Sequence, residues 1–178
     1  MALIHIASVT ASASATVSFT TGIDATYNEY QFHFVNMHPA SYGDWTFQVN
    51  ATDGADYNDS LITSTHFKTY NREAPADTFL GYMAGHDQAQ GAAYQIMFNG
   101  VDNAADSGCS GVLTLYAPSS TTYVKHFTSR VQSIHGGNYS QNAFVAGYIN
   151  DTTAIDEISF KFHSGNIDAG TIHMYGVG

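Results

Sequence analysis

Two histidines in one aromatic-rich run have side chains whose chemistry could serve a functional site. His33 and His38 lie in the run YNEYQFHFVNMHP, which spans residues 27–39 and also contains asparagine. Imidazole nitrogens bind metals and act as general bases near neutral pH. The run therefore raises two candidate chemistries, a metal centre or acid–base catalysis, and both require the two rings to share a face.

Alternation along a strand separates these two histidines. Successive side chains of a β-strand point to opposite faces, so Tyr30, Phe32 and Phe34 are predicted to form one core-facing stripe. His38 falls on that same side. The opposite face is predicted to carry Gln31, His33, Val35 and Met37. A metal site within this run would need a β-bulge, and we expect half-buried strand histidines instead.

Three aspartates in NATDGADYND form the densest acidic cluster. Asp53, Asp56 and Asp59 recur at every third position, and oxygen-rich loops bind calcium. The spacing is not that of an EF-hand, and the terminal glutamate is missing. Two interpretations stay open: a calcium site made by these carboxylates, or a solvated turn around Gly54.

Aromatic side chains near predicted turns suggest a second kind of site. Sugars bind aromatic faces together with amide and carboxylate side chains, and such sites need little charge. We take Trp45, Tyr57 and Tyr82 as candidate carbohydrate-binding residues. The alternative is that such rings cover a sheet surface or a subunit contact.

The sequence lacks the motifs of common enzymes and cofactor sites. It contains no HExxH, G-x-S-x-G, P-loop or G-x-G-x-x-G pattern, so we expect no enzyme activity and no cofactor. Cys109 is the single cysteine, which rules out a disulfide within the chain. Its setting, DSGCSG, offers no neighbouring base, and we expect an unreactive loop thiol.

The charge of the chain narrows the range of partners. The 178 residues include 15 Asp and Glu but only 5 Lys and Arg, a formal net charge of −10. Such a field repels phosphate backbones and anionic lipid surfaces, so we expect neither nucleic-acid binding nor membrane insertion. No apolar run approaches the ~20 residues of a membrane span. No Lys or Arg precedes the ASASA segment near the N-terminus, so we expect no secretory signal.

Short alternating segments must position all of these residues. Aromatic and β-branched residues are abundant, and Gly, Asn and Asp separate the runs. No segment shows the apolar spacing of an amphipathic helix. Strands are expected at 2–8, 15–20, 29–38, 44–50, 60–70, 78–85, 92–101, 111–117, 122–134, 143–150, 154–163 and 171–177. This pattern predicts an all-β, antiparallel two-sheet β-sandwich of jelly-roll type, with residues 1–178 forming a single domain.

Several phrases of the sequence resemble those of one group of proteins. They are the C-terminal SGNIDAGTIHMYG, the EYQFHFVNMHPAS run with the WTFQVN that follows, the G-x-x-Y-N turn at 54–58, and PSSTTYVKHF at 118–127. Together they are similar to small structural or tail-fibre-like virion proteins of marine bacteriophages, cyanophages among them. The resemblance covers most of the chain. It implies a β-sandwich on the virion exterior and carries no catalytic residues.

From these observations we expect a non-enzymatic bacteriophage virion protein that is made in the host cytoplasm. It would form part of a tail fibre or another appendage on the virion exterior. The expected partners are further copies of the chain, with a homotrimer favoured, other virion proteins, and a host surface glycan. A capsid decoration protein and a lectin-like carbohydrate-binding module are the alternatives.

Overall fold

Thirteen strands make up the computed structural model, which describes residues 2–52, 54, 57 and 60–178. Among these residues the regular elements are all strands, which confirms the predicted all-β class. The described part of the chain contains no helix with the length and apolar character needed to cross a membrane. The strands are β1 Leu3–Thr10, β2 Val17–Phe19, β3 Glu29–Pro39, β4 Gly43–Ala51, β5 Ile62–Arg72, β6 Thr78–Tyr82, β7 Ala89–Gly91, β8 Gln95–Val101, β9 Cys109–Tyr116, β10 Lys125–His135, β11 Tyr139–Ile149, β12 Ile155–Phe162 and β13 Ile167–Val177.

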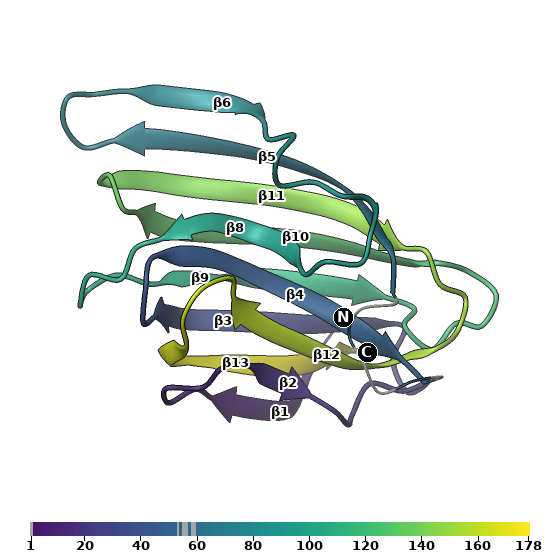
Figure 1. The fold of residues 1–178 in the computed structure, drawn as a ribbon. Helices are drawn as coiled ribbons and strands as arrows, with labels where there is room; N and C mark the ends of the chain where they lie inside the picture. The colour runs from purple at the N-terminus through teal and green to yellow at the C-terminus, as the bar shows by residue number, and fades with distance from the viewer. Residues whose placement is uncertain (1, 53, 55–56, 58–59) are drawn as a thin grey trace.

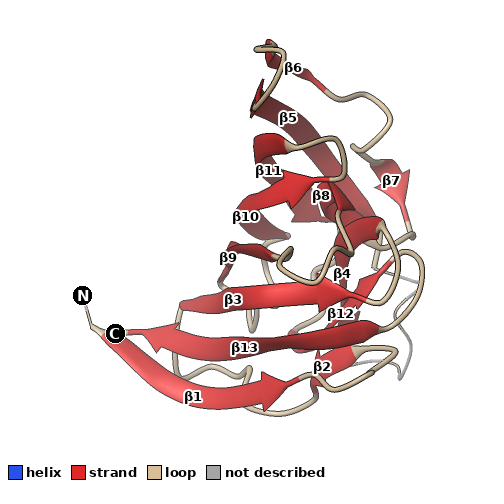
Figure 2. Ribbon diagram, turned by 90° about the vertical axis from the view of Figure 1, so that its left-hand side faces the viewer, coloured by secondary structure: helices blue, strands red, loops and turns tan. Residues whose placement is uncertain are grey.

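The strands pair antiparallel in two runs that meet at one point. The longer run has the order β1-β13-β3-β9-β10-β11-β5, and both β6 and β7 pair with the far edge of β5. The shorter run has the order β8-β4-β12-β2. A single pair, His135 of β10 with Val101 of β8, joins the two runs. The combined sheet curls into a nearly closed, barrel-like shape (Figure 1, Figure 2).

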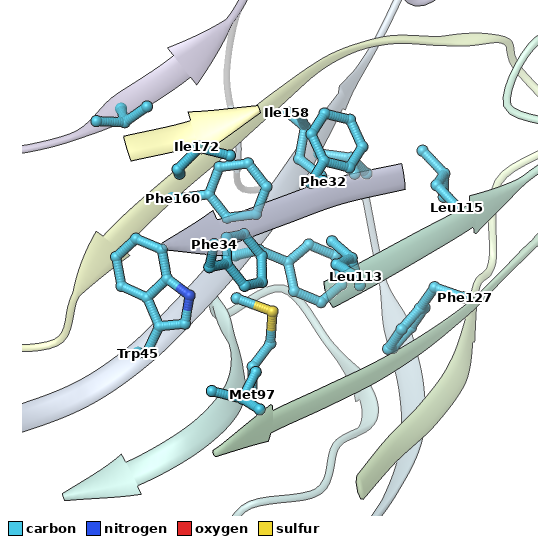
Figure 3. Packing of buried hydrophobic residues seen from close by; sticks show 14 of the residues in the cluster. Phe32, Phe34, Trp45, Met97, Leu113, Leu115, Phe127, Ile158, Phe160 and Ile172 are labelled. Carbon is cyan, nitrogen blue, oxygen red and sulfur yellow. The ribbon is translucent and has the colours of Figure 1, made fainter. Parts of the chain in front are cut away.

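Aromatic side chains from both runs fill the interior. Phe32 and Phe34 of β3 are buried with Trp45 of β4 and Phe160 of β12 (Figure 3). The ring centroid of Phe160 lies 5.2 Å from that of Phe34 and 5.9 Å from that of Trp45. Tyr30 is buried as well, which confirms the predicted core-facing stripe. Each ring removes roughly 150–250 Å² of surface from water, so this cluster contributes a large share of the hydrophobic stabilisation.

A β-bulge at Asn36 reverses the facing of the side chains in the last part of β3. Asn36 has a φ of 50°, and the pairing of β3 with β9 shifts register between Phe34 and Met37. Met37 is fully buried as a result. His38 lies on the outer side, where its Nδ1 is 2.8 Å from the carbonyl oxygen of Ser107. The prediction that His38 shares the core-facing side of Phe34, and that Met37 lies on the opposite face, is therefore wrong, because the inserted residue changes the alternation.

The other strand predictions differ from the structure mainly at three places. The short strand β7 lies between the predicted strands at 78–85 and 92–101, where no strand is predicted. Strands β11 and β13 begin at Tyr139 and Ile167, each four residues before the predicted start. These additions pair β7 and β11 with β5, and β13 with β3, and a local sequence pattern does not show which strands pair.

Candidate functional site

The structure separates the three aromatic residues predicted to bind sugar. Trp45 is fully buried in the core, so a ligand at the surface cannot reach its indole, and this corrects the prediction for Trp45. Tyr57 is half-buried, and its hydroxyl donates to Glu157 Oε2 at 2.9 Å. Burial and this hydrogen bond both raise the pKa of Tyr57. Tyr82 is 55% exposed, and its hydroxyl donates to Asp87 Oδ2. Of the three rings, that of Tyr82 is the most accessible to a ligand.

The candidate metal ligands do not assemble into a centre within the described part of the chain. The aspartates predicted to bind calcium, Asp53, Asp56 and Asp59, lie outside the described residues. Among the residues that are described, no group of three or more His, Cys, Asp or Glu side chains could hold a metal ion. The His33 and His38 run therefore gains no third ligand from the described strands.

Cys109 begins strand β9, where its side chain is fully buried, rather than lying in a loop as predicted. Burial raises the pKa of the thiol, because a thiolate would lose its hydration inside the core. We expect the folded protein to give no reaction with the thiol reagent DTNB, and one thiol per chain to react after unfolding in guanidinium. Rapid reaction of the native protein would contradict the buried position.

The outward side of the longer run carries a continuous polar and aromatic surface. Alternation sends every second side chain of β5, β9, β10 and β11 to this side. The strand register aligns these side chains in transverse rows. One row consists of Val112, Arg130, Phe144 and Phe67. The next row consists of Ser110, Gln132, Asn142 and Thr69. We call the surface made by these eight residues the outer trough.

Three adjoining hollows run along the outer trough. The first, of about 330 Å³, is lined in part by Phe67, Arg130 and Phe144. The second, of about 310 Å³, shares Arg130 with the first and adds Gln132 and Asn142. The third, of about 330 Å³, shares Gln132 and Asn142 with the second. The shared residues make one elongated depression, and each volume lies within the range of about 300–1,000 Å³ typical of small-ligand sites.

Two stacked rings and a guanidinium form the centre of the outer trough. Phe67 and Phe144 stack with their centroids 5.0 Å apart and an angle of 10° between the rings. The Cζ atom of Arg130, on the next strand, lies 5.4 Å from the centroid of Phe144. Phe67 is 42% exposed, and Arg130 is exposed too. Stacking on Phe144 orients the guanidinium of Arg130 while leaving its N–H groups able to donate.

The charged group at the centre of the outer trough lacks a partner among the described residues. Of the described residues that line the three hollows, Arg130 alone carries a full charge, and none is Asp or Glu. The guanidinium of Arg130 makes no hydrogen bond or ion pair to the described residues. Asn142 Oδ1 is buried and has no hydrogen-bond partner among them either. The trough thus presents an exposed positive charge in a chain whose formal net charge is −10.

A second polar group lies on the same side of the longer run, near its β1 end. Ser8 Oγ is 2.7 Å from His5 Nε2 and 2.7 Å from His173 Nδ1. His33 is paired with His173 across β3 and β13, and its Nε2 lies 2.9 Å from Gln31 Oε1. Burial, and then the neighbouring His173, lower the pKa of His33. His5 and His173 thus share the hydroxyl of Ser8 across β1 and β13, whereas the hydrogen bond of His33 stays within β3.

A third polar group is enclosed between β5 and β8. Lys68 Nζ donates to Asn99 Oδ1 at 3.0 Å, and Gln141 Nε2 donates to the same oxygen at 3.1 Å. His66 is fully buried 5.2 Å from the ring of His86, and neither of its nitrogens has a partner among the described residues. Burial lowers the pKa of Lys68. Because these side chains are buried and packed against one another, we assign this group to stability rather than to ligand binding.

One local pattern in the sequence points to the outer trough, although these residues were not predicted as a site. In KHFTSRVQS, buried Phe127 and Val131 alternate with the outward Thr128, Arg130 and Gln132. The alternation alone places Arg130 on an outer face. The side chains that form the outer trough together with Arg130 come from β5, β9 and β11. The sequence does not show that these strands lie beside β10.

Comparison with known proteins adds no assignment. A scan against protein-family models finds no match for this chain, and a search of curated protein sequences finds none either.

Proposed function

We propose that this protein is a non-enzymatic structural component of a bacteriophage virion, part of a tail fibre or another appendage, and that it assembles as a homotrimer. Two observations support the proposal. The first is the set of sequence phrases that resemble marine-phage virion proteins. The second, which carries the geometric argument, is the uncharged sheet edge formed by β1.

Strand β1 leaves one side open for a further strand. It ends the longer run and pairs only with β13 among the described residues. Its sequence, LIHIASVT, contains no Asp, Glu, Lys, Arg or Pro. Proteins that remain monomeric usually protect an edge with such residues, because an open edge recruits other strands. Leu3 is 49% exposed and Ile4 is 43% exposed, so the edge also offers apolar side chains to a second copy.

We also propose that the two runs of strands act as the two sheets of a jelly-roll-like β-sandwich. Rings from the two runs pack against each other in the interior. The centroids of Phe34 and Trp45 are 5.6 Å apart, and those of Phe47 and Phe127 are 5.0 Å apart. Such contact between the inner faces is typical of a sandwich core. The one-pair junction between His135 and Val101 supports the same interpretation.

Sedimentation velocity tests the assembly. At micromolar concentration we expect a trimer, and we expect Leu3→Lys to shift it to the monomer. The reason is that the substitution places like charges at the contact and requires a cation to lose its hydration there.

Leu80→Lys is the matched control, because Leu80 is 74% exposed on β6, at the opposite end of the longer run. It should leave the trimer intact. A monomeric wild-type protein would overturn the assembly proposal. Dissociation by Leu80→Lys but not by Leu3→Lys would show that β1 is not the contact.

A further inference from the structure

We propose that the outer trough binds an oligosaccharide that carries negatively charged groups, either carboxylate or sulfate. This inference goes beyond the proposed virion role and does not depend on it, because the trough lies on β5, β9, β10 and β11, away from the β1 edge.

Arg130 selects the charge of the ligand. Its exposed guanidinium makes no ion pair with the described residues, and no described carboxylate lines the three hollows. Guanidinium groups recognise carboxylate and similar planar or multi-oxygen anions through two parallel hydrogen bonds. Stacking on Phe144 holds Arg130 in place, so less side-chain freedom is lost when the ligand binds. An anionic group is therefore the complement that the centre of the trough lacks.

The adjacent row supplies groups that recognise hydroxyls. Gln132 and Asn142 are paired across β10 and β11, and both line the second and third hollows. The exposed Gln132 amide offers an oxygen that can accept a hydrogen bond from a hydroxyl and N–H groups that can donate one. The amide of Asn142 adds N–H donors beside it, so the pair can hold two hydroxyls of one sugar ring. A simple inorganic anion would leave these groups without partners.

The apolar part of the trough matches the C–H face of a sugar ring, as Arg130 matches its charged group and the amides match its hydroxyls. Phe67 and Phe144 form a stacked apolar ridge one row away from the amides and directly beside Arg130. The C–H face of a sugar ring packs against such aromatic surface, while its hydroxyls reach polar neighbours. The three adjoining hollows extend over both rows, so the trough can accept more than one sugar unit.

A long polyanion such as nucleic acid fits the trough less well. Nucleic-acid sites combine several cations along a groove, whereas this trough has one cation in a chain with a formal net charge of −10. An anionic oligosaccharide, with sparser charge and many hydroxyls, agrees with one guanidinium beside several amides and hydroxyl side chains.

Isothermal titration calorimetry on the full chain provides the test. The probes are a galacturonate hexasaccharide, a sulfated galactan hexasaccharide and a neutral galactan hexasaccharide, with a single-stranded hexanucleotide as a non-sugar anion. We expect one of the two anionic sugars to bind more tightly than the neutral sugar and the hexanucleotide, and the carboxylated and sulfated probes to identify the charged group. Arg130→Gln should weaken that binding by about tenfold or more, because a charge-assisted hydrogen-bond pair is lost.

The controls separate the trough from general charge effects. Lys161→Gln removes the same charge from β12 in the shorter run and should leave the affinity unchanged. Asn142→Ala should weaken binding of charged and neutral probes alike. Arg130→Lys keeps the charge but loses the planar fork, so its affinity should lie between those of wild type and Arg130→Gln. Absence of binding to both anionic sugars, equal losses in Lys161→Gln and Arg130→Gln, or equally tight binding of the hexanucleotide would overturn the proposal. The sedimentation result for Leu3→Lys is independent of all of these outcomes.

Discussion

Phe160→Ala is expected to lower the free energy of unfolding by about 3–5 kcal/mol, the range found when a buried aromatic ring is removed from a core. Phe160 is fully buried and contacts rings from both runs of strands, including Phe32 at a centroid distance of 5.5 Å and Phe34 at 5.2 Å. Its loss removes buried apolar area and leaves a cavity that the rigid sheets cannot close. Urea unfolding monitored by fluorescence of the single tryptophan, Trp45, measures the change.

Two further variants make this measurement specific to the core. Phe160→Leu keeps most of the volume and should cost less than the alanine variant. Phe67→Ala removes the same kind of ring from a 42% exposed position on β5 and should cost about 1 kcal/mol or less. Similar losses for Phe160→Ala and Phe67→Ala would show that the buried aromatic cluster does not carry the stability assigned to it.

Acidification is expected to destabilise the protein through His66. Burial, with the neighbouring His86 as the next cause, lowers the pKa of His66 from 6.5 to about 4. The unfolded chain therefore binds a proton at higher pH than the folded protein does. Stability from this group is complete above about pH 6.5 and falls as the pH drops toward 4. The loss from His66 alone amounts to about 2 kcal/mol by pH 5 and about 3 kcal/mol by pH 4.

Substitution of His66 isolates this contribution. His66→Phe keeps an aromatic ring but cannot bind a proton, so its free energy of unfolding should depend less on pH between 6.5 and 4. His126, which is exposed on β10, provides the matched control, and His126→Phe should keep the wild-type pH profile. Chemical unfolding at a series of pH values gives both curves. If His66→Phe retained the full wild-type slope, other groups, such as His86 and His135, would have to account for it; burial also lowers the pKa of each of these two.

Local periodicity was sufficient to predict the fold class and most strand positions. The alternation of Tyr30, Phe32 and Phe34 predicted their burial, because facing within one strand depends only on position. It failed after Asn36, since a bulge adds one residue and reverses the facing from that point on. Trp45 was misjudged for a different reason. Turn residues precede it, but Trp45 itself lies in strand β4, which carries its indole into the core.

The candidate site was harder to predict because its residues come from four strands. Arg130, Phe144 and Phe67 are adjacent only through the pairing of β10 with β11 and of β11 with β5. Residues 67 and 130 are far apart along the chain, and no local pattern reports which strands become neighbours. The local signal could place Arg130 on an outer face. It could not show that Phe144 supports the guanidinium or that no described carboxylate lines the hollows beside it.

The two runs of strands are joined by a single residue pair, His135 with Val101, and this affects how the protein unfolds. Backbone hydrogen bonds contribute little between the two runs, so all-or-none unfolding must depend on side chains that cross the interior. These are rings such as Trp45 on Phe34 and Phe47 on Phe127, together with side-chain hydrogen bonds such as that of Lys68 to Asn99. Weakening these contacts should allow the shorter run to open while the longer run keeps its strand ladder. Amide hydrogen exchange would then show two levels of protection, with β4 and β12 losing protection before β10 and β11. In this protein side-chain contacts across the interior, the aromatic core above all, rather than the backbone ladder, make the two parts one cooperative unit.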